Sequence, residues 1–167
     1  MDKKLSNFLL VIVAVTLLGT IIFVHEKKQL HHTITSEPIP YAQNLNEWQP
    51  VTAHGSYQPH TDIIINTQPQ TQVLTPFHID DGPTVLINRG HASSRDYETA
   101  PRTAVTIIGY VRHTQPGMSA LLEKHPPETD RIDTQGLALA LNQTFELDYL
   151  QLAEGQPGAL DPAAIPG

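Results

Sequence analysis

The feature that most constrains the fold of this chain is a pair of apolar segments joined by an acidic, glycine-containing turn. Residues 73–79 and 85–88 are rich in β-branched and other apolar side chains, a composition that favours strands. The intervening Asp80-Asp81-Gly82 supplies the short polar side chains and the glycine typical of a reversing turn. The sequence therefore predicts a β-hairpin here, with Asp81 and Gly82 as turn residues.

Pro76 restricts where the first strand of this hairpin can lie in a sheet, and Gly90 restricts where the second strand ends. Pro76 lacks a backbone N–H, so we expect it at a sheet edge or at a bulge. Gly90 follows Asn88-Arg89 and readily adopts a positive φ, so we expect it to turn the chain where the second strand ends. The hairpin is thus predicted to finish close to Arg89 and Gly90.

Short strands and turns are also predicted for the rest of the chain after Trp48. The 14 Pro and ten Gly interrupt the sequence often and disfavour long helices there. One short helix is expected at residues 134–141, with Asp133 as its N-cap. Further strands are predicted at residues 51–57, 62–66, 104–111 and 145–152. We expect a mainly β fold, with an N-terminal transmembrane helix followed by a small antiparallel sheet or open β-barrel with one or two short helices.

An uncharged apolar run, Phe8 to Val24, precedes the β-rich region. Its seventeen residues span roughly 26 Å as a helix, which is near the lower limit for crossing a bilayer core. A cleaved signal peptide has an apolar region of about 7–15 residues and a small-residue cleavage site. This run is longer, and residues 21–25 contain no small-residue pair. We therefore expect an uncleaved anchor.

The orientation of the anchor does not follow from charge, because Lys and Arg are balanced on its two flanks. We expect the long C-terminal part to be translocated across a bacterial inner membrane. The predicted organisation is a cytoplasmic tail (1–7), a single transmembrane helix in contact with lipid (8–24), a tether (25–47), an extracytoplasmic β-rich domain (48–155) and a flexible tail (156–167).

Composition excludes several classes of function. From Gln29 onward there are six Lys and Arg against fifteen Asp and Glu with no basic stripe, so nucleic-acid binding is not expected. The chain has no Cys, and its nine His show neither His-x-His nor HExxH spacing, so no metal site is predicted. Ser93-Ser94 lacks a nucleophile-elbow context. We expect a protein that is not an enzyme.

Arg89 and Trp48 are the residues that the sequence first selects as contacts with a ligand or partner. The Arg89 guanidinium offers a rigid donor fork for a carboxylate. The alternative, which we favour, is a structural arginine that binds Asp81, Asp96 or a backbone carbonyl. If Arg89 bound a ligand, Arg89→Ala would weaken function more than stability. Trp48 is the only Trp and is expected mainly to pack in the core.

Several motifs together resemble the Surfeit locus protein 1 family of cytochrome c oxidase assembly factors. They follow the apolar N-terminal run in this order: Trp48-x-x-Val51, Gly55-x-Tyr57, Val73-Leu74-Thr75-Pro76-Phe77, Asp81-Gly82, Val85-Leu86-Ile87-Asn88-Arg89-Gly90, Val105-x-Ile107-x-Gly109-x-Val111-Arg112 and Ile132-Asp133. The likeness covers roughly residues 5 to 155. It implies an extracytoplasmic β-rich domain and a role in maturing the haem-copper oxidase, with the oxidase catalytic subunit or other assembly factors as partners and haem a as a cofactor handled on the way.

The chain departs from the family pattern in two features. Where the family usually has Trp after Arg-Gly, this chain has His91, which becomes a third candidate contact. The family also continues into a second membrane helix preceded by an Asn-Asn-His-Leu-type motif, whose histidine is the proposed haem contact. These 167 residues include neither, so three forms stay open: a single-pass relative, half of a split protein or a truncated product. A generic anchored β-module that binds an envelope protein or small ligand, without a link to respiration, is the alternative function.

Overall fold

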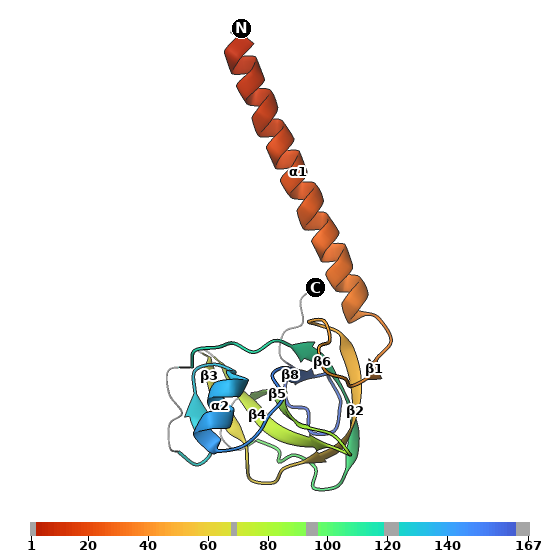
Figure 1. The fold of residues 1–167 in the computed structure, drawn as a ribbon, viewed down its shortest axis with the longest axis vertical. Helices are drawn as coiled ribbons and strands as arrows, with labels where there is room; N and C mark the ends of the chain where they lie inside the picture. Colours follow the sequence, from red (N-terminus) through yellow and green to blue (C-terminus); the bar gives the residue numbers. More distant parts are fainter. Residues whose placement is uncertain (1–2, 68–69, 93–96, 119–123, 163–167) are drawn as a thin grey trace. The chain divides into compact units, whose positions relative to one another are not determined.

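The computed structural model describes residues 3–67, 70–92, 97–118 and 124–162, and the chain divides into two units, residues 1–36 and 37–167. The first unit is the helix α1 (Lys3–Ile34). The second contains the strands β1 to β8 and the helix α2 (Figure 1). Each unit is described by itself.

Helix α1 exposes apolar side chains throughout its described apolar part, from Ile12 to Val24. Over the residues that the structure describes, no helix combines the length and the apolar character needed to cross a membrane. The predicted span Phe8–Val24 begins before Ile12, the first residue whose side chain is described.

The helix continues through residues 25–34, where the sequence analysis expected an extended tether. No proline interrupts this stretch before Pro38. Hydroxyl groups also bond back onto the helical backbone, as Thr33 Oγ1 does with the Gln29 carbonyl at 3.0 Å. The later part of the expected tether joins the domain, because β1 (Ile39–Pro40) pairs in parallel with β2 (Pro50–Tyr57).

Five strands of the domain close into a barrel, in the order β2, β6 (Val105–Arg112), β8 (Tyr149–Leu152), β5 (Thr84–Ala92), β4 (Gln70–Ile79) and back to β2. The pairing of β5 with β8 is parallel, and the other four pairings are antiparallel. The prediction of a β-rich fold is confirmed. The finer prediction of a small antiparallel sheet or open β-barrel is met only in part, because β5 and β8 pair in parallel and the pairing of β2 with β4 completes a mixed barrel.

Strand β4 closes the barrel by changing partners along its length. Its first half pairs with β3 (Ile63–Thr67), and its last three residues pair with β2. Pro76 lies at the change of partner, where its missing N–H breaks no ladder bond and its carbonyl accepts from Gln58 N at 2.9 Å. Pro76 is therefore neither on an edge strand nor at the bulge, which lies between Gln72 and Leu74.

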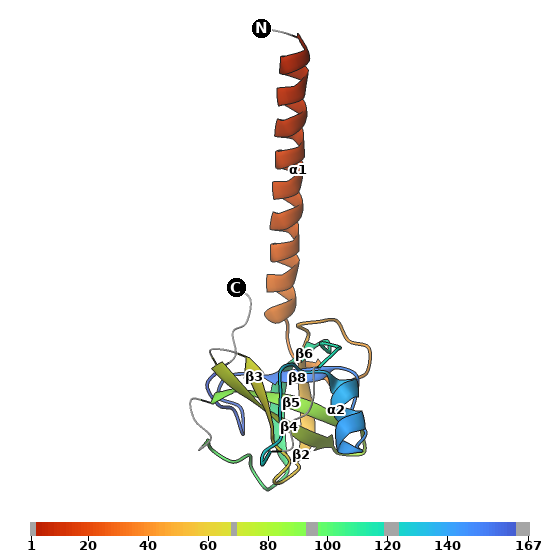
Figure 2. The ribbon, with the colours of Figure 1, turned by 90° about the vertical axis from the view of Figure 1, so that its left-hand side faces the viewer.

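The barrel has separate inner and outer apolar clusters. The inner cluster comprises Val51, Ala53, Tyr57, Phe77, Val85, Ile87, Ile107, Val111, Leu150 and Leu152. The outer cluster, Ile63, Ile65, Leu74, Leu86, Ile132, Leu137 and Tyr149, is covered by α2 (Thr134–Leu141), which lies against the outside of the barrel in Figures 1 and 2. The short strand β7 (Glu128–Thr129) extends the sheet from β3. Both faces of the β4–β5 hairpin are thus buried.

Helix α2 (Thr134–Leu141) is capped at its N-terminus by Asp133, as the sequence predicted. One carboxylate oxygen of Asp133 accepts from Gly136 N at 2.9 Å, and the other accepts from Gly117 N at 2.7 Å and Met118 N at 3.2 Å. Burial alone would raise the pKa of this carboxyl, but hydrogen bonds from the backbone N–H groups outweigh it and lower the pKa. The charged carboxylate is therefore the form that stabilises the fold.

We expect the stability of the domain to depend on pH through Asp133. A lowered folded-state pKa gives stabilisation that is complete above the ordinary Asp pKa of about 3.9 and is lost as pH falls through the folded pKa. Asp133→Asn should reduce the free energy of unfolding by about 1 kcal/mol at pH 7 and flatten its decline below about pH 4. Urea unfolding of both chains between pH 3 and 7 measures this. Parallel pH curves would contradict it.

Strand β5 is longer than predicted and includes Arg89, Gly90 and His91. Gln72 pairs with His91 and Leu74 with Asn88, so Arg89 and Gly90 together face a single β4 residue. Gly90 adopts φ 111° within this bulge. Gly90 therefore lies inside the strand and not at its end.

Residues 157–161 lie along β5, although the sequence analysis assigned them to a flexible tail. Leu160 N donates to the Arg89 carbonyl at 2.8 Å, and His91 N donates to the Asp161 carbonyl at 2.7 Å. A Cβ on Gly90 would lie 2.1 Å from the Asp161 carbonyl oxygen, so only glycine permits this approach. The ordered domain thus extends beyond the predicted limit at residue 155, and residues 163–167 lie outside the described part.

The last predicted strand, residues 145–152, is confirmed only for its second half, Tyr149–Leu152. The alternating pattern placed Leu147 on an apolar face and Leu150 on a polar one. In the structure Leu147 is 52% exposed and Leu150 is fully buried in the inner cluster. The alternation failed because β8 is buried on both faces, so its apolar residues need not alternate.

Candidate functional site

Arg89 lies in the interior of the barrel near one end of β5. Alternation along the strand places Val85, Ile87 and Arg89 on one face, and the two aliphatic residues belong to the inner cluster. Arg89 is only 1% exposed. A charge buried this deeply needs specific partners to offset its loss of water.

The partners of the Arg89 guanidinium come from three separate segments. Nε donates to the Gly158 carbonyl at 2.7 Å, and Nη2 donates to the Glu98 carbonyl at 2.5 Å. Nη1 lies 3.8 Å from Asp62 Oδ2 and has no hydrogen-bond partner among the described residues. Arg89 therefore binds the segments around residues 98 and 158 to the barrel.

Asp62, directly before β3, is the acidic centre of this network. Thr75 Oγ1 donates to Asp62 Oδ1 at 2.5 Å, and the Tyr97 hydroxyl donates to Asp62 Oδ2 at 3.1 Å. Burial raises the pKa of Tyr97, and the neighbouring Asp62 charge raises it further. Burial also raises the pKa of Tyr57, an effect that the Arg89 charge partly opposes. Both phenols remain protonated donors at neutral pH.

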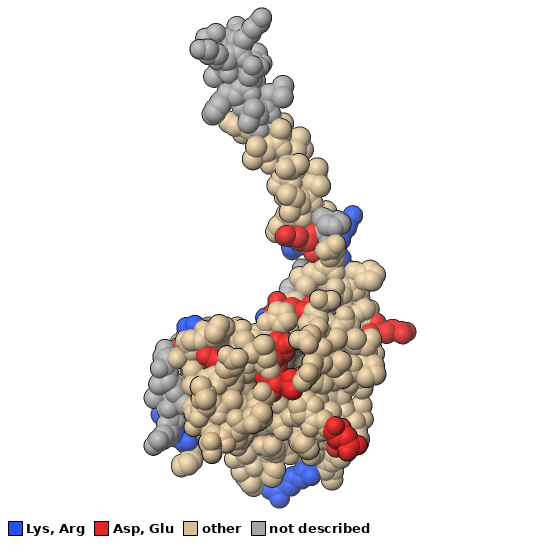
Figure 3. Space-filling view, viewed as in Figure 1, with Lys and Arg blue, Asp and Glu red and all other residues tan. Residues whose placement is uncertain are grey.

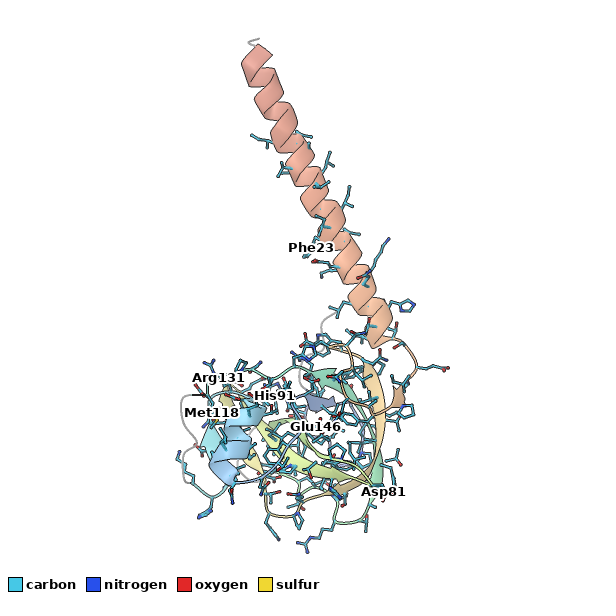
Figure 4. The ribbon with its side chains drawn as sticks, viewed as in Figure 1. Phe23, Asp81, His91, Met118, Arg131 and Glu146 are labelled. Carbon is cyan, nitrogen blue, oxygen red and sulfur yellow. The ribbon has the colours of Figure 1, made fainter. Side chains whose placement is uncertain are left out.

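These contacts place Arg89 in the structural role that the sequence analysis favoured. The predicted backbone-carbonyl contact is present, the predicted contact with Asp81 is not, and the one with Asp96 is untested. Asp81 lies in the turn between β4 and β5, at the outer end of the hairpin (Figure 4), and Asp96 lies outside the described residues. Gly82 lies in the same turn, and the left-handed φ of 54° belongs to Asp81.

A pocket opens beside Asp62, and its empty space is about 410 Å³ including the open mouth. One wall is the end of β2 and the segment after it, and the other is the segment before β6. Its lining residues are Tyr57, Gln58, Pro59, His60, Asp62, Thr99, Ala100, Pro101 and Arg102. The pocket combines an aromatic ring and prolines with two potentially cationic side chains, which is the mixed lining typical of small-molecule sites.

Trp48 lies elsewhere on the domain and is 8% exposed. The Arg112 guanidinium carbon lies 3.9 Å from the centre of the Trp48 ring, and Arg112 also binds Glu47 Oε1 and Gln151 Oε1, each at 3.0 Å. The backbone N–H of Trp48 donates to the Val111 carbonyl at 2.7 Å. Trp48 is therefore packed in the domain beneath the Arg112 guanidinium, as expected of a residue whose main role is core packing.

His91 is on the opposite face of β5 from Arg89, because the bulge at Arg89 and Gly90 reverses the alternation. It pairs with Gln72, whose side chain accepts from Asn88 Nδ2 at 2.8 Å. Its Nδ1 is buried and has no partner among the described residues. The three sequence candidates, Arg89, His91 and Trp48, therefore do not form one site.

The pocket beside Asp62 does not fit a haem group. The pocket beside Asp62 is small, and the one histidine that lines it, His60, is exposed at its edge. His91 does not line this pocket. In the described part of the chain, no three His, Asp or Glu side chains come close enough to hold a metal ion.

Sequence reasoning missed Asp62, Tyr97 and Arg102. Asp62 precedes three consecutive Ile residues, and an acid at the start of a buried strand is a signal for a buried partner. Nothing in the local sequence indicated that the partner would be Arg89, since the barrel closure brings them together. Arg102 stands in a polar segment that carries no distinctive pattern.

Comparison with known proteins gives one consistent family. The family model described as the SURF1 family matches residues 19–166. An uncharacterized SURF1-like protein of Mycobacterium bovis and one of Mycobacterium tuberculosis are each 27% identical to this chain over 164 residues. The match covers 84% of this chain and 60% of the length of each relative, so the chain spans less than two thirds of these relatives.

Proposed function

Because this chain belongs to the SURF1 family, we propose that it is a non-enzymatic assembly factor for cytochrome c oxidase. The observation that carries the proposal is the family match over residues 19–166, which includes every strand of the barrel. The proposed partners are the oxidase catalytic subunit or other assembly factors. The haem-containing subunit is the product whose maturation the chain assists.

The site chemistry supports a binding role over a catalytic one. Arg89 and Asp62, the most deeply buried charged pair of the described residues, bind loops and hydroxyl groups and leave no nucleophile beside a base. The face of the domain drawn in Figure 3 carries Asp and Glu near its centre and along its right-hand side, and its Lys and Arg lie at the margins. That distribution supports a protein partner over a nucleic acid.

We also propose that α1 anchors the domain in the bacterial inner membrane, with residues 37–167 on the extracytoplasmic side. Residues 8–24 carry no charge, and the described apolar side chains from Ile12 to Val24 are exposed around the helix. An exposed apolar helix surface is stable in lipid and costly in water. This anchoring would hold the barrel beside membrane-embedded oxidase subunits.

Deleting the gene in its host tests the proposed function. We expect lower cytochrome c oxidase activity and lower haem a content in the membranes, with both restored by the full chain on a plasmid. An otherwise identical chain with Gly55→Ala, where a Cβ would meet the His78 carbonyl at the pairing of β2 with β4, should restore neither. Oxidase of normal activity and normal haem a content in the deletion strain would refute the proposal.

The restored strain also tests the anchoring. The chain should remain with the membrane fraction after alkaline washing, and its domain should be digested by protease added to spheroplasts. A cytoplasmic marker protein must survive the same treatment. Full protection of the domain would contradict the proposed topology and leave the role in oxidase assembly to be judged by the deletion alone.

A further inference from the structure

The C-terminal part of helix α1 carries basic side chains on one face. The helix runs without a break from Lys3 to Ile34, so the residues after the apolar run keep helical spacing. Residues three and four apart on a helix are neighbours, and successive residues are turned by about 100°. Four exposed side chains therefore share an arc of roughly 140°, which we call the basic face: Lys27, Lys28, His31 and His32.

No acidic residue of α1 lies on this basic face. Glu26 is the one acid between residues 8 and 34, and it is turned by about 190° from the centre of the basic face. The half-buried side chains of this part of the helix, Leu30, Thr33 and Ile34, also fall outside the arc. The basic face thus presents ammonium groups and imidazole rings without a carboxylate among them.

The basic face begins where the apolar run ends. Lys27 follows Val24 by three residues, so the face extends from roughly 4 Å to 12 Å beyond the apolar run. The headgroup layer of a bilayer is about 5–8 Å thick on each side, and helical side chains tilt toward the N-terminus. Lys27 Nζ lies 5.6 Å from the centre of the Phe23 ring, one turn back along the helix (Figure 4). In an anchored chain this ammonium group lies at the depth of the lipid phosphates.

We propose that the basic face of α1 binds the headgroup phosphates of anionic phospholipids in preference to those of neutral ones. A lysine ammonium group attracts a phosphate as a compact charge with three donors, and this attraction is strongest where the headgroup has no cation of its own. The proposal rests on the proposed anchoring of α1 and adds to it the class of lipid that surrounds the helix end. It does not depend on a role in oxidase assembly.

Electron paramagnetic resonance of the full chain in phosphatidylcholine vesicles tests this preference. Trace spin-labelled lipid in contact with the helix moves more slowly than bulk lipid, so its fraction measures association. Spin-labelled phosphatidylglycerol should associate about fivefold more strongly than spin-labelled phosphatidylcholine, the scale expected for one lysine at a lipid surface. The phosphatidylcholine signal separately reports whether α1 is inserted at all.

Variants identify the groups that select the lipid. Lys27→Gln with Lys28→Gln should reduce the preference for phosphatidylglycerol to less than about twofold and leave the association of phosphatidylcholine unchanged. Arg102→Gln with Arg131→Gln removes two charges from exposed positions of the domain and should keep the fivefold preference.

Two results would overturn the proposal and leave the anchoring intact: equal association of the two lipids with the natural chain, or an undiminished preference in the lysine variant. Absence of slowly moving phosphatidylcholine would instead overturn the anchoring and, with it, the lipid site. The role in oxidase assembly is judged separately by the deletion strain.

Discussion

Replacing Arg89 with alanine is expected to lower the free energy of unfolding of the barrel domain by about 3–5 kcal/mol. The change removes the donors to the Glu98 and Gly158 carbonyls and the cation 3.8 Å from Asp62. It leaves the partly buried Asp62 with fewer partners and a cavity at the end of the barrel. Each of these effects destabilises the folded state and has no counterpart in the unfolded chain.

Urea unfolding of the full chain, followed by Trp48 fluorescence, measures this loss. Arg89→Lys is the first control, because lysine keeps the charge but not the planar fork that reaches two carbonyls, so it should recover only part of the stability. Arg112→Ala is the matched control at a partly exposed arginine and should cost about 1 kcal/mol. If Arg89→Ala unfolded at the same urea concentration as the natural chain, Arg89 would return to the ligand-binding role that the sequence left open.

Gly55→Ala is expected to destabilise the domain by about 3 kcal/mol, because it opens the barrel at its closing pair of strands. A Cβ on Gly55 would lie 2.0 Å from the His78 carbonyl oxygen and 2.9 Å from Phe77 Cε1. The closest atom is backbone in a paired strand, so it cannot move aside as a flexible side chain would. The strands β2 and β4 must separate instead.

Hydrogen exchange and urea unfolding together measure the effect of Gly55→Ala. The amides that join the segments at the closure, Gln58 N to the Pro76 carbonyl and Asp80 N to the His54 carbonyl, should lose protection first. Gly82→Ala is the control, because its nearest neighbours are side-chain atoms of Ile79 at 3.2 Å and 3.3 Å. It should change stability by less than about 1 kcal/mol. Unchanged protection at Gln58 and Asp80 would mean that β2 and β4 tolerate the added methyl group.

The hairpin illustrates which parts of the fold are visible in a sequence. Its turn at Asp80 to Gly82 and the cap at Asp133 depend on short-range chemistry, so the residues alone predict them. The limits of β5 depend on the segment that pairs beside it. Residues 157–161 extend the strand past Gly90, and local propensity contains no information on a partner so far along the chain.

The candidate contact residues show the same division between features that the local sequence predicts and features that depend on distant partners. The sequence identified Arg89 as a donor fork and Trp48 as a packing residue, because both follow from side-chain type. It could not identify Asp62 as the partner of Arg89 or place Arg102 at a pocket. Those contacts depend on β4 leaving β3 for β2, which brings the ends of several strands together.

The sequence by itself determined the apolar N-terminal run, the short β-rich elements, the capped helix and, through its ordered motifs, the family. These depend on composition and on interactions between residues close in the chain. Only the tertiary structure decided that the sheet closes into a mixed barrel and that Arg89 is buried at its end. Those outcomes depend on contacts between distant residues, above all the approach of β2 to β4 at Gly55, where no side chain keeps the backbones apart.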